Sequence, residues 1–388
     1  MKPRIVRSGI VALAVAASLS ACGQQAGSGS SGAAGVAPLA AGSGPDVPYS
    51  LGTFERNGQA MLGLVLRETQ VVDIAQANAA FEAGNASAPK LAVPADMTAL
   101  IAAYDTGWKE RLAAIARAVP AEGAPAYAYQ MDGLKALPPV RPAVILNAGG
   151  NYTEHSQGIA AQQARSGNAP APIQKGVAAP GIWERKADDP RPENPYLFIK
   201  SPSVVAGAFD PIVMPRGRTN IDFECEFDAV IGKKAKYVPL DSAADYIFGY
   251  TIQIDVSDRG GRGDRKMGGS DWLIGKNHDT FGPLGPVIVP RQFLKDPLNT
   301  RHTFTLNGDV MQDSNTNRMD YNIYELVHYA SNILTLNPGD IVSGGSPAGT
   351  NIERAEPRWM RAGDTAVCTI EGIGQQKHAV VAEGASTN

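Results

Sequence analysis

A short acidic stretch, residues 222–228, constrains this chain more than any other part of its 388 residues. In an extended strand, successive side chains point to opposite faces. Phe223, Cys225 and Phe227 would then share one face, and four carboxylates would line the other. These carboxylates belong to Asp222, Glu224, Glu226 and Asp228. Because the apolar run 229–231 follows at once, we expect the strand to enter a core and to bury part of its acidic face.

The acidic face is a candidate metal site. Carboxylates gathered on a partly buried face repel each other and resist desolvation unless a proton or a cation neutralises them. Hard divalent ions such as Mg²⁺, Mn²⁺ and Ca²⁺ prefer carboxylate oxygen. A second predicted strand, with Thr251 and Gln253 on one face, ends at Asp255 on that same face. Glu224, Glu226 and Asp255 would leave room for water or a chelating substrate; the alternative is an exposed acidic face that binds no ion.

Basic residues and a histidine accompany these strands. Arg259 follows Asp255 by four residues, and Lys276 lies in a polar segment further on. Either cation could bind an anionic substrate oxygen next to a metal, although a single Arg or Lys near a turn is more often a solvated surface charge. His155 is the general-base candidate because it lies on a polar, helix-like stretch directly after a buried strand. Three other histidines are expected to be ordinary surface or helix residues: His302, His328 and His378.

Residues 1–21 have the pattern of an export signal. Basic residues precede an apolar run at 10–19, which is much shorter than the about 20 residues of a membrane span. Cys22 follows small residues as in a bacterial lipobox, so we expect lipidation there and a lipoprotein anchored on the periplasmic side. The alternative is an ordinary signal peptide that contains a cysteine. Residues 22–47 are rich in Gly, Ser and Ala and predict a flexible tether.

Composition narrows the class of protein. With 44% hydrophobic and 19% charged residues, the chain can form a packed core and is not a disordered protein. A formal net charge of −3 argues against binding to nucleic acid, which requires a basic face. Three cysteines are too few for a disulfide scaffold. We therefore expect a globular protein that binds a small molecule and meets the membrane only through its lipid anchor.

A small α/β domain is predicted over residues 48–138. Strands are expected at 51–54, 61–66 and 71–74, with Asn57–Gly58 as a hairpin turn between the first two. Residues 95–119 have apolar residues at helical spacing and predict one amphipathic helix or two. The domain has no catalytic constellation, so we expect it to be structural.

The larger domain, residues 139–384, is predicted to be mainly β-structure. A polar helix is expected at 153–165 and an apolar-faced helix at 322–334. The predicted strands, of which the last is expected to close the chain, are 144–147, 196–199, 223–231, 246–255, 287–289, 303–306 and 365–370. The fold class of the whole chain is therefore α+β, mainly β.

Six motifs in this order resemble those of the fumarylacetoacetate hydrolase family. They are Asn151–His155, Phe223–Glu226, Gly249–Arg259, Gly275–Pro286, Asn307–Gln312 and Gly345–Gly349. The resemblance implies a mixed β-sandwich roll as the catalytic domain, a small leader domain and a homodimer. It also implies action on 2-oxo acids or 1,3-diketo acids with a divalent metal, Mg²⁺ first among the candidates.

The resemblance further implies roles for single residues. Glu224, Glu226 and Asp255 would hold the metal, which stabilises the enolate of the substrate. Lys276 would stabilise the developing oxyanion, and His155 would activate water from a lid helix. The implied substrate-binding residues are Tyr152, Arg259 and Ser346.

One departure from the family leaves the reaction open. Several family hydrolases pair the lid histidine with a glutamate three residues later, where this chain has Gly158, and Glu154 would point away from His155 on a helix. We expect a hydrolase that cleaves a carbon–carbon bond of an acylpyruvate or 2,4-dioxo acid. The alternatives are a decarboxylase, hydratase or lyase acting on a related 2-oxo acid and, in a different class, a non-catalytic binding lipoprotein.

Overall fold

The structure, a computed structural model, describes residues 38–40, 45–165, 179, 181–183, 188–191, 194–260 and 271–385. Within these ranges, no helix is both long enough and apolar enough to cross a membrane. The predicted signal peptide, the lipidation site Cys22 and most of the tether lie outside the described residues.

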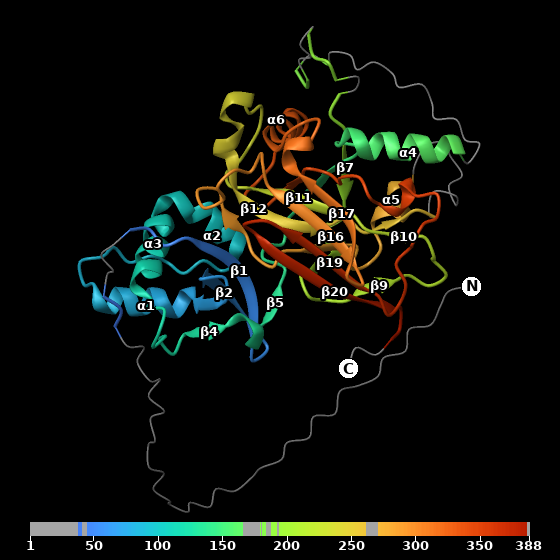
Figure 1. Ribbon diagram of the computed structural model, residues 1–388. Coiled ribbons are helices and arrows are strands. Elements are labelled where there is room, and N and C mark those ends of the chain that lie inside the picture. Colours follow the sequence, from blue (N-terminus) through green and yellow to red (C-terminus); the bar gives the residue numbers. More distant parts are fainter. Residues whose placement is uncertain are drawn as a thin grey trace, which may run out of the picture. The chain divides into compact units, whose positions relative to one another are not determined.

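The described chain folds into strands that far outnumber its helices (Figure 1). The helices are α1 Ile74–Gly84, α2 Met97–Ala103, α3 Trp108–Ala118, α4 Thr153–Arg165, α5 Trp272–Lys276 and α6 Ile323–Ile333. The strands are β1 Tyr49–Arg56, β2 Gln59–Leu66, β3 Gln70–Asp73, β4 Ala128–Gln130, β5 Lys135–Leu137, β6 Ile145–Ala148, β7 Leu197–Lys200, β8 Val205–Gly207, β9 Ile212–Met214, β10 Ile221–Asp222, β11 Cys225–Ile231, β12 Ile247–Ile254, β13 Ser257–Asp258, β14 Gly282–Leu284, β15 Val289–Pro290, β16 Arg301–Leu306, β17 Asp309–Asn315, β18 Ile341–Ser343, β19 Thr365–Ile370 and β20 Gly374–Ala382.

The N-terminal sheet has the strand order β4-β3-β2-β1-β5, and α1 and α3 both contact β2 (Figure 1). The predicted hairpin turn is confirmed, since Asn57 and Gly58 both have positive φ angles, 51° and 75°. The predicted helical region is two helices, α2 and α3, separated at Gly107 with a φ of 117°. The predicted strand at 71–74 ends one residue early, because the Asp73 side chain accepts a hydrogen bond from the Gln76 amide and starts α1.

The central sheet has eight strands, and β11 lies inside it between β18 and β12. The strand predicted at 223–231 is interrupted, because β10 ends at Asp222 and β11 begins at Cys225. Every residue of β11 is buried, and Glu226 pairs with Gln253 of β12. A second, five-stranded sheet has the order β17-β16-β19-β20-β9 and packs on the apolar side of β11. There Phe223 stacks on Phe304, with ring centroids 4.1 Å apart.

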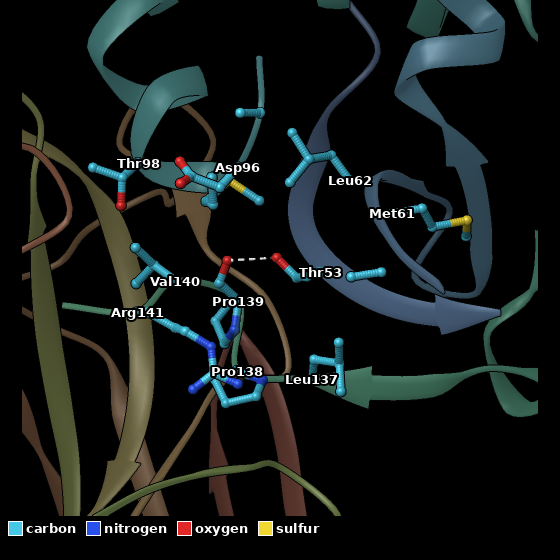
Figure 2. Close-up of a pocket in the computed structure, with 13 residues that line it drawn as sticks. Thr53, Met61, Leu62, Asp96, Thr98, Leu137, Pro138, Pro139, Val140 and Arg141 are labelled. Carbon is cyan, nitrogen blue, oxygen red and sulfur yellow. Dashed lines mark hydrogen bonds between the residues drawn. The ribbon is translucent and has the colours of Figure 1, made fainter. Parts of the chain in front are cut away.

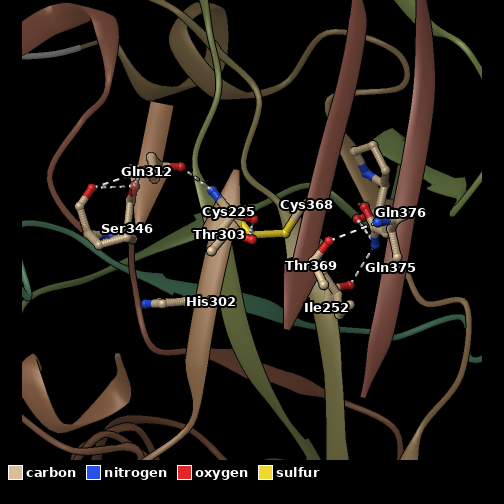
Figure 3. The surroundings of a disulfide bond; sticks show 12 residues. Cys225, Ile252, His302, Thr303, Gln312, Ser346, Cys368, Thr369, Gln375 and Gln376 are labelled. Carbon is tan, nitrogen blue, oxygen red and sulfur yellow. Dashed lines mark hydrogen bonds between the residues drawn. A yellow bond between two sulfur atoms is a disulfide. The ribbon is translucent and has the colours of Figure 1, made fainter. Parts of the chain in front are cut away.

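A disulfide joins the two sheets directly behind the acidic face of β11 (Figure 3). It links Cys225 of β11 to Cys368 of β19, 143 residues apart in sequence, and both cysteines are fully buried. Composition predicted no disulfide scaffold, and this bond is a single cross-link inside a large core. The alternation of residues 223–227 had already placed Cys225 on that apolar face.

The N-terminal sheet and the central sheet share buried contacts. One hydrophobic cluster contains Leu51 and Leu64 together with Val230 and Ile341 of the central sheet. Leu51 and Ile288 also exchange two backbone hydrogen bonds, of 2.9 and 2.7 Å. A cavity of about 260 Å³ lies between β1, β2 and the segment 137–141, and its lining includes none of the predicted site residues (Figure 2).

Two expectations are wrong: that the strand at 365–370 closes the chain, and that His302 and His378 are surface or helix residues. The strand predicted at 365–370 is present as β19, but β20 follows it and completes the sheet between β19 and β9. β20 was not predicted because two of its inward-pointing residues, Gln376 and His378, are polar and interrupt the apolar alternation. The Gln376 amide donates to three backbone carbonyls, and the Nδ1 atom of His378 lies 2.6 Å from the carbonyl oxygen of Asp210. His302 on β16 is also buried, so neither His302 nor His378 is a surface residue.

Candidate metal centre

Three carboxylates converge where β11 begins and β12 ends. One oxygen each from Glu224, Glu226 and Asp255 lies within 4.8 Å of the others, and all three residues are buried. The Asp255 amide donates to the Glu224 carbonyl at 2.8 Å, and this hydrogen bond joins the residue before β11 to the residue after β12. A set of three carboxylate oxygens is the donor chemistry of Mg²⁺, Mn²⁺ or Ca²⁺. The residues present therefore fit a divalent metal.

Two predicted cations and one that was not predicted contact the triad. Lys276 Nζ donates to Glu224 Oε2 at 2.6 Å and also to Asp255. Arg259 Nη2 donates to Glu224 Oε1 at 2.5 Å. Lys200 is fully buried on β7, and its Nζ donates to Asp255 Oδ1 at 2.5 Å. Its signal in the sequence is a lone charge at the end of an otherwise apolar strand.

The electrostatics of the triad favour an added cation. Burial, reinforced by the charges of Asp255 and Glu224, raises the pKa of Glu226 well above its usual value. Burial also acts to raise the pKa of Glu224, but Arg259 and Lys276 outweigh it and hold that pKa well below its usual value. Lys276 compensates the charge of Glu226 only in part, and a divalent ion next to Glu226 would complete the compensation.

Polar side chains on neighbouring strands orient Glu226. Asn147 Nδ2 donates to Glu226 Oε2 at 2.7 Å and to Gln253 Oε1 at 2.6 Å, and the Ser343 hydroxyl donates to the same Glu226 oxygen. Asn147 and Ser343 are paired in register on β6 and β18, so their side chains lie on one face. The sequence motifs contained neither residue. Such partners fix the direction of a metal-binding carboxylate.

His155 lies against the triad and has an acidic partner. Its Nε2 atom is 3.6 Å from Glu224 Oε1, and its Nδ1 atom is 2.5 Å from Glu353 Oε1. Glu353 ends the short 3₁₀ helix Asn351–Glu353, where the Thr350 hydroxyl donates to the same carboxylate oxygen. Burial tends to raise the pKa of Glu353, but hydrogen bonds from His155 and Thr350 outweigh it and lower that pKa. The orienting acid is thus present, 198 residues from its histidine in sequence.

Gly158 explains how Glu353 reaches this position. His155 and Gly158 lie on α4, which is the helix predicted at 153–165. A Cβ atom at Gly158 would lie 2.7 Å from Glu353 Oε2 and 2.8 Å from its Cγ. The absence of a side chain at Gly158 therefore makes room for the carboxylate of Glu353. The position that lacks the family's glutamate is filled through space by another glutamate.

Of the predicted substrate-binding residues, Tyr152 and Ser346 are buried and Arg259 is partly buried, and all three already have partners. The Tyr152 hydroxyl lies 3.3 Å from His302 Nε2. Arg259 is held by Asp222 as well as by Glu224. The Ser346 hydroxyl accepts a hydrogen bond of 3.0 Å from Gln312 Nε2. Figure 3 shows Gln312 between Ser346 and the disulfide, and its side-chain oxygen accepts from the Cys225 amide at 3.1 Å.

Solved structures of several enzymes share this fold. Maleylpyruvate hydrolase from Sphingobium sp. SYK-6, crystallised with manganese(II) and pyruvate, aligns over 86% of this chain and 99% of its own, with a TM-score of 0.60 and 24% identity. Fumarylacetoacetate hydrolase from Exiguobacterium antarcticum aligns over 86% of this chain and 100% of its own, with a TM-score of 0.63 and 23% identity. At these identities the likeness establishes the fold alone: a mainly β region with curled sheets.

Sequence comparisons give the family. A mitochondrial oxaloacetate tautomerase of Xenopus laevis is 40% identical over 192 residues, which are 50% of this chain and 60% of that protein. The chain thus spans about 60% of the length of the first curated relatives that it matches. An uncharacterized protein of Pyrococcus abyssi is 36% identical over 244 residues, 63% of this chain and 92% of its own length. The model of the fumarylacetoacetate hydrolase C-terminal region matches residues 145–381, and the chain therefore belongs to that family.

Proposed function

We propose that this protein is a metal-dependent hydrolase that cleaves a carbon–carbon bond of an acylpyruvate or related 2,4-dioxo acid. The observation that carries the proposal is the pairing of His155 with Glu353 next to the metal ligand Glu224. A histidine oriented by a carboxylate at Nδ1 presents its Nε2 atom as a base. Gly158 had favoured other reactions, and the place of Glu353 removes that objection.

The residues divide the reaction between them. A bound divalent metal would supply Lewis-acid stabilisation of the substrate enolate. His155 Nε2 takes a proton from water, and the resulting hydroxide adds to the acyl carbonyl carbon. The bond from that carbon to the methylene then breaks; its electron pair forms the enolate of pyruvate, which is protonated on carbon. Lys276 Nζ stabilises the oxyanion, and the products are a carboxylate and pyruvate.

Keto–enol tautomerisation of oxaloacetate or a related 2-oxo acid is the second candidate. The 40% identity to a relative named oxaloacetate tautomerase favours it. The same residues would serve, because the enolate that ends the cleavage is also the intermediate of tautomerisation. The two reactions differ in the group with which His155 exchanges a proton: a water molecule in hydrolysis, and the substrate carbon in tautomerisation.

We also propose the cofactor, assembly and location that the sequence predicted. Mg²⁺ is the first expected ion, with Mn²⁺ and Ca²⁺ sharing its oxygen preference, and the assembly is a homodimer. The Cys225–Cys368 bond supports export, since such bonds persist in oxidising compartments. It also leaves Cys22 as the third of the three cysteines, in keeping with lipidation there.

The test of the reaction is a product analysis with purified protein and Mg²⁺ or Mn²⁺. Acetylpyruvate should give acetate and pyruvate in equal amounts, and His155→Ala should lower kcat by about 100- to 10,000-fold. Enol loss from oxaloacetate without cleavage of acetylpyruvate would replace hydrolysis by tautomerisation. Release of CO₂ alone would indicate a decarboxylase.

A reciprocal substitution tests the role of Glu353. Glu353→Gly should lower kcat by about 10- to 100-fold, because His155 loses its orienting partner. Gly158→Glu in that background restores a carboxylate in the space that Glu353 vacates, so kcat should partly recover. Gly158→Glu alone should fail, since its side chain would collide with Glu353. Equal kcat of Glu353→Gly and the wild-type protein would show that the carboxylate has no such role.

A further inference from the structure

A row of aromatic rings leads from the surface to the lysine beside the metal ligands. Trp272 stacks on Phe198, with ring centroids 4.6 Å apart and planes 17° apart, and the Tyr196 ring lies 6.2 Å from Trp272. Lys276 Nζ is 5.0 Å from the Phe198 centroid and 6.0 Å from that of Trp272. Exposure rises outward along this row, from 7% for Phe198 to 50% for Tyr196.

Two periodicities build the row. Tyr196, Phe198 and Lys200 alternate along β7 and the residue before it, so they share one face of this edge strand. Trp272 and Lys276 are four residues apart in α5 and share one side of that helix. Each series ends in a lysine that binds Asp255. The rings are therefore directed to the metal centre by the same elements that supply its lysines.

Neighbouring contacts hold the rings in place. Asn277 accepts a hydrogen bond from the Ser201 amide at 2.5 Å and donates to the Trp272 carbonyl at 2.9 Å, which ties α5 to the end of β7. Tyr196 packs on Gly149, where an added Cβ atom would lie 2.8 Å from its ring. Gly149 directly precedes the loop that enters α4, the helix of His155. The row thus lies between α5 and the entry to the helix that bears the base.

From this geometry we propose that Tyr196, Phe198 and Trp272 form the subsite for the acyl group of the substrate, and that the enzyme prefers aromatic or bulky apolar acyl groups. The inference rests on the proposed hydrolysis of an acylpyruvate. Glu224, Glu226 and Asp255 would hold the metal that binds the 2-oxo acid end of that substrate, and the acyl group would extend away from Lys276. Ring faces carry negative potential and apolar surface, so they accept an aryl or alkyl group and disfavour a second carboxylate.

The competing explanation is that the rings only support Lys276. A cation over an aromatic face is stabilised by the ring quadrupole, and this would position the ammonium group for any substrate. The two roles differ in one measurable respect. If the rings only support Lys276, replacing one of them should lower kcat/KM for every substrate equally. If they bind the acyl group, the replacement should change the ratio of kcat/KM between substrates.

The test compares benzoylpyruvate with acetylpyruvate, which differ only in the acyl group. The Mn²⁺-loaded wild-type protein should favour benzoylpyruvate in kcat/KM by about 10- to 100-fold, the range of a filled apolar pocket. Trp272→Ala and Tyr196→Ala should each bring this ratio close to one. Leu273→Ala is the matched control, since Leu273 is 72% exposed on the same helix and should leave the ratio unchanged. Equal losses on both substrates in Trp272→Ala would overturn the subsite.

A binding measurement separates failure of the subsite from failure of the proposed reaction. 4-Phenyl-2-oxobutanoate and 2-oxobutanoate both offer the chelating end, and neither has the second carbonyl that hydrolysis needs. Calorimetry with the Mn²⁺-loaded protein should show about tenfold tighter binding of the phenyl compound, lost in Trp272→Ala. A preference in binding without cleavage of any acylpyruvate would support the subsite and contradict hydrolysis. Cleavage of acetylpyruvate with no preference in binding would support hydrolysis and contradict the subsite.

Discussion

The two faces of β11 differ in what they contribute, although their residues alternate along one strand. On one face, Glu224 and Glu226 both lie in a buried cluster of carboxylates and cations. On the other, Cys225 and Phe227 pack against the second sheet and β12, through a disulfide and through a stack with Tyr250 at 5.0 Å. Buried like charges oppose folding, whereas buried apolar contacts and a cross-link favour it.

The fold tolerates this buried acidic site because the reverse face of the same strand is stabilising. A strand that carried only the acidic face would have to desolvate charges without compensation. Here each carboxylate is followed by a residue that stabilises the fold on the reverse side, one position along the chain. Substitutions on the two faces should therefore have opposite signatures: loss of stability with activity kept, or loss of activity with stability kept.

The largest expected effect concerns the apolar face. Replacing both Cys225 and Cys368 by Ala removes a cross-link of 143 residues and should lower the free energy of unfolding by about 5 kcal/mol. The folded fraction at 25 °C should keep its metal affinity, because β11 stays hydrogen-bonded to β12 and β18. Urea unfolding and Mn²⁺ titration measure the two quantities, with Cys22→Ala as the control. Loss of metal affinity without loss of stability would break the division between the faces.

Glu226→Gln on the acidic face should give the opposite result. We expect kcat to fall by about 1000-fold, equivalent to about 4 kcal/mol, together with metal affinity. The metal-free variant should be at least as stable as the wild type. Burial raises the pKa of Glu226, so keeping this group ionised in the folded state costs free energy that grows as pH rises above the unfolded value.

The gain in stability of Glu226→Gln should therefore be larger at pH 8 than at pH 5, in unfolding experiments with a chelator present. The wild-type protein, unfolded at pH 8 and at pH 5 with the same chelator, is the reference. A variant that is less stable than the wild type at both pH values would show that Glu226 stabilises the metal-free fold.

The apolar side of β11 has a titrating group nearby, His302, which should make stability depend on pH. His302, on β16 of the second sheet, is buried, and burial lowers its pKa to about 4. An unfolded histidine titrates near 6.5, so protons bind the unfolded chain first as pH falls. Stability should thus decrease between pH 6.5 and pH 4, by up to about 3 kcal/mol from this residue.

His302→Gln should flatten that profile, as measured by unfolding at half-unit steps of pH. Part of the slope should remain, because burial also lowers the pKa of His378. An unchanged slope in His302→Gln would show that His302 is protonated without unfolding of the chain.

The sequence predicted those parts of the site that depend on local periodicity. Alternation in residues 223–227 separated the acidic from the apolar side chains. The polar, helix-like stretch at 153–165 has the bounds of α4, and the apolar face at 322–334 identified α6 to within one residue at each end. Asp255, Lys276 and His155 became candidates through their places at strand ends and in polar segments, and the family resemblance then assigned their roles. The structure brings the three residues together.

Partners that meet only through space could not be predicted in this way. Glu353 reaches His155 across 198 residues, and no local pattern distinguishes it from an ordinary helix-capping glutamate. Lys200 and Asn147 approach the triad because β7 and β6 occupy one end of the central sheet, and this order is a property of the fold. The disulfide is missed for the same reason, since its cysteines lie on strands of different sheets.

The smallest expected effect tests the residues that orient the acidic face. Asn147→Ala removes the amide that donates to both Glu226 and Gln253, and it should weaken Mn²⁺ binding by about 10- to 100-fold, or about 1.4–2.7 kcal/mol. Thr251→Ala is the matched control. Thr251 is equally buried on the same face, but its hydroxyl donates to the Val287 carbonyl at 2.7 Å. That control should lose stability and keep metal affinity; equal metal affinity in both variants would mean that Glu226 needs no orientation from β6.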